Sequence, residues 1–111
     1  MTYKELKNVI AGIGLPYAYN EFKNGTDRTP PFICFLFTDT SEDFFADNTL
    51  YARIRPLRIE LYTDDKDFEL EDRVEDALVA AGILFTRSED YITTEHMYQI
   101  VYEGDLLITK E

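Results

Sequence analysis

An unbroken apolar run, Phe32 to Phe37 (FICFLF), constrains the fold of this chain more than any other segment. Pro31 precedes the run, and the polar residues Thr38 and Asp39 follow it. Its length and its aromatic and β-branched content are typical of a strand that is covered on both faces. The sequence therefore predicts a central β-strand here. Cys34 lies in the middle of the run, where a small core hydrophobe is expected rather than a reactive thiol.

Two apolar stripes with helical spacing predict helices near residues 3–12 and 68–81. The stripes consist of Leu6, Val9, Ile10 and Ile13 in the first helix, and of Leu70, Val74, Ala77, Leu78 and Ala81 in the second. Thr2 and Glu5 have the spacing of a capping box at the start of the first helix. Gly82 has the position of a C′ residue that ends the second helix.

The alternation of apolar and polar residues between Leu50 and Thr63 predicts one long strand. Pro56 cannot donate to a strand ladder, so this strand is expected to lie at an edge there or to carry a bulge. Asp39 to Asn48 is expected to form an acidic loop that contains Phe44 and Phe45.

Shorter strands complete the expected sheet. They are Tyr17 to Phe22, Ile83 to Arg87 and Tyr98 to Tyr102, with Leu106 to Ile108 extending the last strand past a bulge at Gly104. Ser88 to Glu95 is expected to connect the last two strands. The element order is then α-β-β-β-α-β-β. We expect a single α+β domain over residues 1–111, with two helices packed on a mostly antiparallel sheet.

The composition bears on possible partners. The 111 residues carry 22 acids and 11 bases, a formal net charge of −11. Such a surface repels phosphate backbones and anionic membranes, because binding them relies on Lys and Arg. Sequence-specific nucleic-acid binding and membrane binding are therefore not expected. The acidity fits a nucleic-acid mimic, the wall of a negatively charged channel, or solubility alone. The N-terminus has the pattern of a helix start rather than a signal peptide, so an intracellular product is expected.

The carboxylates between Asp64 and Asp72 match a calcium-binding loop poorly when the loop is aligned to begin at Asp65. The sixth position is then Leu70 instead of glycine, and the twelfth is Asp76 instead of glutamate. Acids at these positions complement the positive end of the helix dipole. No metal site is predicted.

Catalytic patterns are equally weak. His96 is the only histidine, and neither Ser41 nor Ser88 has the sequence context of a nucleophile. The five glycines are scattered and form no phosphate-binding loop. We predict no catalytic residue and no cofactor, and we do not expect an enzyme. A metal-dependent enzyme is the alternative that the acids leave open.

Phe44 and Phe45 are the candidate functional residues, together with the neighbouring Asp47 and Asn48. Adjacent residues in a loop rarely both become buried. One or both aromatic side chains could fill the core under the loop. Alternatively, at least one is an aromatic anchor at a subunit interface, where such residues dominate the binding energy.

Several short segments in this order resemble a known family. They are Gly14 to Tyr19 (GLPYAY), Pro30 to Ile33 (PPFI), Phe44 to Asn48 (FFADN), Ile59 to Thr63 (IELYT) and Lys66-Asp67, followed by Glu71, Glu75, Glu95 and Tyr98. Over nearly its whole length the chain is similar to the small tail terminator (tail completion, head–tail joining) proteins of long-tailed phages and prophages of Gram-positive hosts.

The resemblance implies a non-enzymatic α+β subunit that forms a ring, commonly a hexamer, at the end of the phage tail tube. The implied partners are further copies of the chain, the tail tube protein and the head–tail connector protein. The implied location is the tail of the virion, after synthesis in the host cytoplasm. None of the matching segments is catalytic. The alternative function is that of an acidic DNA mimic that inhibits a host nuclease or restriction enzyme.

Overall fold

The computed structural model describes residues 1–21, 29–38, 41–47 and 49–110. In these ranges the chain forms two helices and a mixed six-stranded sheet with the order β1-β2-β4-β6-β5, in which β3 also pairs with β4. The elements are α1 (Tyr3–Gly12), β1 (Tyr17–Tyr19), β2 (Phe32–Phe37), β3 (Glu42–Ala46), β4 (Thr49–Thr63), α2 (Phe68–Ala80), β5 (Thr86–Ile92) and β6 (Met97–Thr109). Only β1 pairs in parallel, with β2. The predicted α+β class and the mostly antiparallel sheet are confirmed.

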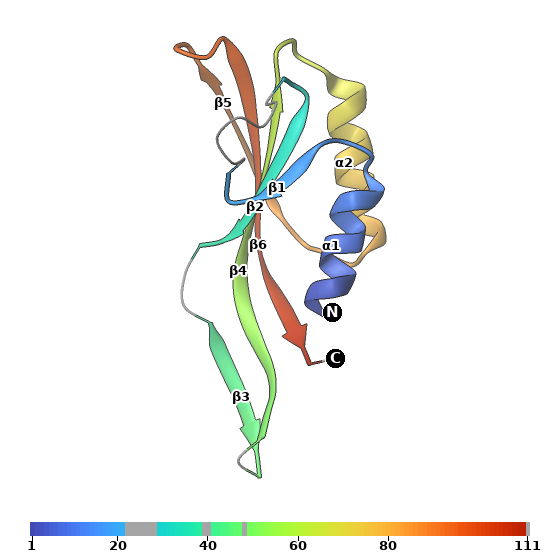
Figure 1. The fold of residues 1–111 in the computed structure, drawn as a ribbon, viewed down its shortest axis with the longest axis vertical. Helices are drawn as coiled ribbons and strands as arrows, with labels where there is room; N and C mark the ends of the chain where they lie inside the picture. Colours follow the sequence, from blue (N-terminus) through green and yellow to red (C-terminus); the bar gives the residue numbers. More distant parts are fainter. Residues whose placement is uncertain (22–28, 39–40, 48, 111) are drawn as a thin grey trace.

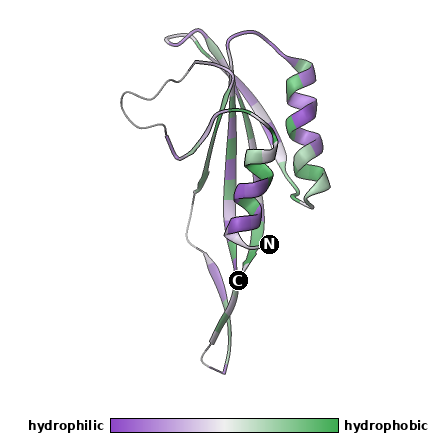
Figure 2. Cartoon of the chain, turned by 45° about the vertical axis from the view of Figure 1, so that its right-hand side comes forward, coloured by the Kyte–Doolittle hydropathy of each residue, from purple (hydrophilic) through white to green (hydrophobic). Residues whose placement is uncertain are grey.

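Both helices lie on the same face of the sheet (Figure 1). Hydrophobic and hydrophilic residues alternate along the elements, as expected for elements that bury only one side (Figure 2). The core between the helices and the sheet contains the least exposed apolar side chains, which are Leu6, Ile10, Ile33, Ile59, Leu61, Val74, Leu78 and Ile100. The two predicted helical stripes and the odd-numbered residues of the FICFLF run thus meet in one core.

The helix ends follow the predicted capping chemistry. Thr2 Oγ1 accepts a hydrogen bond from the Glu5 amide at 3.1 Å, and the Glu5 carboxylate accepts one from the Thr2 amide at 3.1 Å. After α2, Gly82 adopts φ 76°, which lets the Ile83 amide donate to the Leu78 carbonyl at 2.9 Å. Both helices therefore begin and end within a residue or two of the predicted positions.

The longest element, β4, forms the centre of the sheet. On one side it pairs with β6 from Ala52 to Thr63, and on the other with β2 and then with β3. The β2 pairing stops at Leu57 and the β3 pairing begins at Ile54, so Pro56 lies where that side of β4 has no ladder partner. The missing N–H of Pro56 therefore interrupts no ladder. The predicted local edge at Pro56 is confirmed.

Two predicted loops are wrong. The segment expected as an acidic loop contains β3, because residues 42–46 pair with β4 although all of them are exposed. Ser88 to Ile92 belongs to β5 and pairs with β6 in regular register. Both segments lie at sheet edges and expose side chains on both faces. They therefore lack the alternation by which sequence patterns indicate strands. Residues 39, 40 and 48 of the first segment lie outside the described residues. The predicted Tyr17 to Phe22 strand is too long, because β1 ends at Tyr19 and Asn20 adopts φ 66°. Its last residue, Phe22, lies outside the described residues.

The predicted bulge at Gly104 is also wrong. Gly104 pairs with Leu57 in an unbroken register between β4 and β6. A Cβ atom at this position would lie 2.0 Å from the Leu84 carbonyl oxygen, in the segment that leaves α2. Glycine is required here because another stretch of backbone crosses close to the strand.

The Gly104→Ala substitution should therefore destabilise the fold, by about 1–3 kcal/mol in the free energy of unfolding, because backbone must shift to admit one methyl group. Urea unfolding followed by circular dichroism measures the change. Gly12→Ala is the matched control, since a Cβ atom at Gly12 meets nothing within 4 Å. The control should unfold at the same or a slightly higher urea concentration. Equal midpoints for the two variants would contradict the close backbone approach.

Candidate functional site

The candidate interface residues lie on a projecting arm, formed by β3 and residues 49–54 of β4. The arm has two strands at residues 49–51, and β6 is its third strand from Ala52 on. The arm extends away from the body of the protein at the lower end of the sheet (Figure 1). Phe44 is 45% exposed, Phe45 is 66% exposed, and Tyr51 on the opposite strand is 57% exposed. Asp47 is also exposed, at the turn. The predicted residue Asn48 lies outside the described residues.

The pairing in the arm directs the aromatic side chains to both of its faces. Phe44 pairs with Ala52 and Phe45 with Leu50, so a register shift leaves Tyr51 as the extra residue on β4. Phe44 and Phe45 are neighbours on β3 and therefore point to opposite faces. Neither fills the hydrophobic core, as their exposure shows. The interface reading of these residues therefore remains as a prediction.

Little within the chain stabilises the end of the arm. An ion pair joins Asp43 to Arg53 at 3.2 Å across the two strands, and such surface pairs contribute at most about 1 kcal/mol. The third strand, β6, pairs with β4 only as far as Ala52. Isolated two-stranded ribbons are marginally stable in water. The end of the arm is thus a surface that gains stability when another surface covers it.

A second apolar surface lies beside α1. This surface, the α1 groove, has a volume of about 320 Å³ and is lined mainly by Tyr3, Tyr19, Phe35, Phe37, Lys7 and Arg55. Its aromatic rings pack edge to face. The ring centroids of Tyr3 and Phe37 are 5.7 Å apart, and those of Tyr19 and Phe35 are 5.4 Å apart. Tyr3 and Tyr19 are both exposed by more than a third, so the lining is partly open to solvent.

Arg55 lies between the aromatic rings of the α1 groove. Its guanidinium carbon is 4.2 Å from the centroid of the Phe37 ring, and Nη1 donates to the Tyr3 hydroxyl at 3.0 Å. Its Nε atom is buried and has no hydrogen-bond partner among the described residues. The groove thus combines aromatic surface with a cation that is only partly satisfied.

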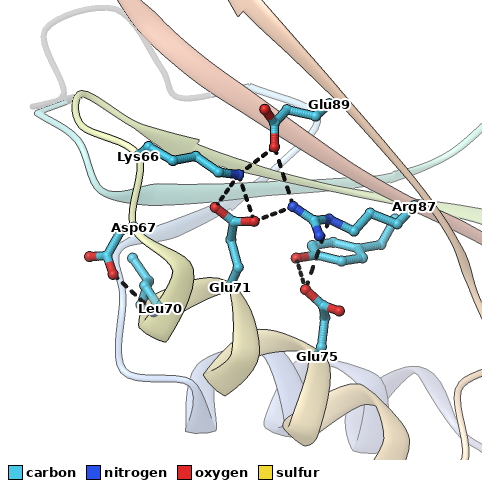
Figure 3. Close-up of polar contacts among 8 residues, drawn as sticks. Lys66, Asp67, Leu70, Glu71, Glu75, Arg87 and Glu89 are labelled. Atoms are coloured by element: carbon cyan, nitrogen blue, oxygen red, sulfur yellow. Dashed lines mark hydrogen bonds and ion pairs between the residues drawn. The ribbon is translucent and has the colours of Figure 1, made fainter.

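The acid cluster that sequence reasoning tested as a metal site has two structural roles. Asp67 caps α2, since its carboxylate accepts from the Leu70 amide at 3.0 Å. Glu71 is 1% exposed and binds Lys66 Nζ at 2.7 Å and the Arg87 guanidinium (Figure 3). These contacts join the start of α2 to β5. In the part of the chain that the structure describes, no three His, Cys, Asp or Glu side chains are placed to hold a metal ion.

The burial of Glu71 was not predicted, although the sequence contains a signal for it. Glu71 lies three residues before Val74 and seven before Leu78, so it occupies the apolar stripe of α2. A carboxylate at such a position requires cationic partners, because an unpaired buried charge is very costly. Lys66 and Arg87, the nearest bases on either side in the sequence apart from Arg73, supply them.

Two tyrosine hydroxyls in the sheet, those of Tyr62 and Tyr102, are hydrogen-bond donors that stay protonated. Tyr102 donates its hydroxyl to Glu75 at 2.9 Å, and burial together with this hydrogen bond raises the pKa of Tyr102 far above its ordinary value. Burial also raises the pKa of Tyr62 to about 12, and its hydroxyl donates to Glu60 at 2.9 Å. Neither hydroxyl can act as a base near neutral pH.

The residues considered for catalysis do not form a recognisable set in the structure. His96 is exposed in the turn between β5 and β6, with φ 53°. Ser41 donates its hydroxyl to Asp43 at 2.6 Å beside the arm, and Ser88 is exposed on β5.

No helix among the described residues is long and apolar enough to cross a membrane.

Replacing Glu71 tests its role in holding α2 to the sheet. Glu71→Gln should lower the free energy of unfolding by about 1–3 kcal/mol, because two cations lose a charged acceptor. The loss is limited because the Lys66 and Arg87 side chains are 21% and 37% exposed and can turn to water. Urea unfolding measures the effect. Glu69→Gln, at an exposed acid two residues earlier, should stay within about 0.5 kcal/mol of the wild type. Equal losses in the two variants would show that the contacts of Glu71 with Lys66 and Arg87 make no specific contribution to stability.

Comparisons with known proteins show similarity to solved structures. No protein-family model matches the chain, and no curated protein matches it. Among solved structures, the fold is similar to that of a chain in the virion of a native gene transfer agent (GTA) particle. The TM-score is 0.61 at 13% sequence identity, and the match covers 97% of this chain and 91% of that chain. At this identity the likeness concerns the fold, which the two chains share over nearly their whole lengths.

Proposed function

We propose that this chain is a non-enzymatic structural protein of a phage-like virion. In this proposal it forms a ring at the end of a tail tube and joins the tube to the head connector, as a tail terminator protein does. Its partners are further copies of itself, the tail tube protein and the connector protein. It is made in the host cytoplasm and is then located in the tail of the virion.

The arm is the observation that carries the proposal. It presents Phe44, Phe45 and Tyr51 to solvent on a ribbon that has little support of its own. Exposed aromatic side chains on a projecting ribbon are typical of subunit contacts, because aromatic residues contribute most of the binding energy at protein interfaces. An enzyme, by contrast, needs a nucleophile, base or metal set in a cleft, and none is recognisable in the described residues.

Two further observations support the proposal. The fold is similar to that of a chain from a virion particle over nearly its full length. The sequence segments that resemble tail terminators also include the arm residues 44–48. In a ring, each subunit presents two different complementary patches, and the arm supplies one of them.

The acidity of the chain is compatible with a ring around a DNA channel. Glu69, Asp72 and Asp76 are exposed along α2, and like charge prevents DNA from adhering to such a surface. The same acidity would also suit a DNA mimic. The two functions differ in their complexes, because a mimic binds a DNA-binding enzyme tightly and a terminator binds tail tubes.

Replacing both Phe44 and Phe45 with Ser tests the role of the arm. Thermal melting of the monomer should barely change, since both side chains are already exposed. Ring formation, or capping of purified tail tubes, should be lost, because interface aromatics often contribute about 2 kcal/mol or more each. Native mass spectrometry measures the ring, and electron microscopy of tail tubes measures the capping.

Phe68→Ser provides the matched control, because Phe68 is a 68% exposed aromatic residue away from the arm. It should fold and assemble as the wild type does. Normal assembly of the double variant would remove the arm from the mechanism. Destabilisation of its monomer by about 3–5 kcal/mol would instead assign the two residues to the core. A tight complex with a nuclease or restriction enzyme, without capping of tail tubes, would support the DNA mimic.

A further inference from the structure

We infer that the α1 groove is the complementary patch of the ring, and that it receives the arm of a second copy with Phe45 in the groove. The inference rests on the proposed function, since it assumes that copies of the chain associate. It adds to that function the identity of the second surface. Of the segments that resemble tail terminators, Gly14 to Tyr19 contributes one residue, Tyr19, to this surface.

The unpaired cations of the α1 groove are the first argument. Lys7 and Arg55 line the groove and form no ion pair with the residues that the structure describes. Lys4, one turn before Lys7 on α1, also forms no ion pair with a described residue. In a chain with 22 acids and 11 bases, cations without acidic partners at one place are unexpected. They give this surface a local charge opposite to that of the whole protein, which attracts the acids of another copy.

The chemistry of the arm matches that of the groove. Phe45 is two residues from Asp47, which is exposed and forms no ion pair within the described part of the chain. An aromatic side chain followed by a carboxylate fits a groove with aromatic walls and two cations at its side. Arg55 forms no ion pair with the described residues, and its guanidinium lines the groove, where an incoming carboxylate would supply a charged acceptor.

The size and the lining of the groove also favour this occupant. A volume of about 320 Å³ accommodates an aromatic side chain, and Tyr3 and Tyr19 are 43% and 52% exposed at its walls. A larger cavity of about 440 Å³ is a poorer site for the arm. Glu21 and Glu95 line that cavity, and they repel the acids beside Phe45.

The direction of the arm makes the contact one between copies. β4 continues without interruption from the body into the arm, which extends away from α1 (Figure 1). No residue of β3 lines the groove of its own chain. Because the arm and the groove are different surfaces, each copy can donate one and accept the other. Repetition of such a contact closes a ring when its rotation allows.

Cross-linking between separately labelled chains tests this contact. One chain carries Ala46→Cys next to Phe45, and the other carries Ala11→Cys, one turn after Lys7 on α1. Phe45, Lys7 and Arg55 stay in place in both chains. The two are mixed, alone or with tail tubes, and treated with a short bismaleimide cross-linker. The native Cys34 is buried and serves as the background in both. We expect a heterodimeric product whose linkage peptide mapping assigns to positions 46 and 11.

Val79→Cys is the control, because Val79 is 66% exposed on α2 and does not line the groove. It should give little or no product with Ala46→Cys. In unlabelled protein, Phe45→Ser should weaken association by roughly 30-fold or more if Phe45 is an interface hot spot. Lys7→Glu should weaken it as well, with the monomer melting as the wild type does.

The outcomes separate this inference from the proposed function. If rings form or tubes are capped, but Ala46→Cys reacts equally with both partners or with neither, the groove contact is wrong and the proposed function stands. If Ala46→Cys links instead to the tail tube protein, the arm contacts the tube and the inference is overturned. If the protein neither self-associates nor caps tubes, both the function and the inference are refuted.

Discussion

The pairing of β4 with its neighbours is the constraint on which the other features depend. One strand of 15 residues carries the core contacts of the body and, at its other end, one side of the arm. The antiparallel ladder with β6 runs from Ala52 to Thr63 and fixes the register of both parts together. A slip by one residue would turn Leu57, Ile59 and Leu61 out of the core. The orientation of the arm is therefore set by the same hydrogen bonds and packing that stabilise the body.

Sequence reasoning succeeded where the physical signal is local. The FICFLF run, the two helical stripes and the caps at Thr2 and Gly82 each contain in a few residues the chemistry that determines their structure. Pro56 was informative for the same reason, because a missing N–H restricts a strand position whatever surrounds it. Such features can be predicted from the periodicity of apolar residues and from the backbone N–H groups available for hydrogen bonds. Contacts with residues far away in the sequence need not be known.

The failures concern features that depend on residues far apart in the chain. β3 pairs only because β4 continues beyond the body, and its own residues show no alternation. Gly104 is determined by the approach of Leu84, and Glu71 by Lys66 and by Arg87 on another strand. For the same reason, only part of the candidate site could be predicted from the sequence. Phe44 and Phe45 could be selected from the sequence, whereas the α1 groove is assembled from α1, β1, β2 and β4.

The net charge gives the proposed assembly its main electrostatic difficulty. Each copy carries a formal charge of −11, so identical copies repel one another as they approach. At physiological ionic strength the Debye length is about 8 Å, and repulsion between charges farther apart than this is largely screened. Contacts at the groove act over shorter distances. Pairs such as Asp47 with Lys7 or Arg55 are screened less once the surfaces meet and exclude water.

Salt weakens both the repulsion between copies, which favours assembly, and the ion pairs at the groove, which opposes it. A moderate salt concentration reduces the general repulsion first, whereas a high concentration also weakens the ion pairs at the groove. The aromatic contact of Phe45 with Tyr3 and Tyr19 is apolar and is not weakened by ionic screening. An acidic chain can therefore associate through one cationic, aromatic surface. Its other faces keep the negative charge that repels other copies of the chain and DNA.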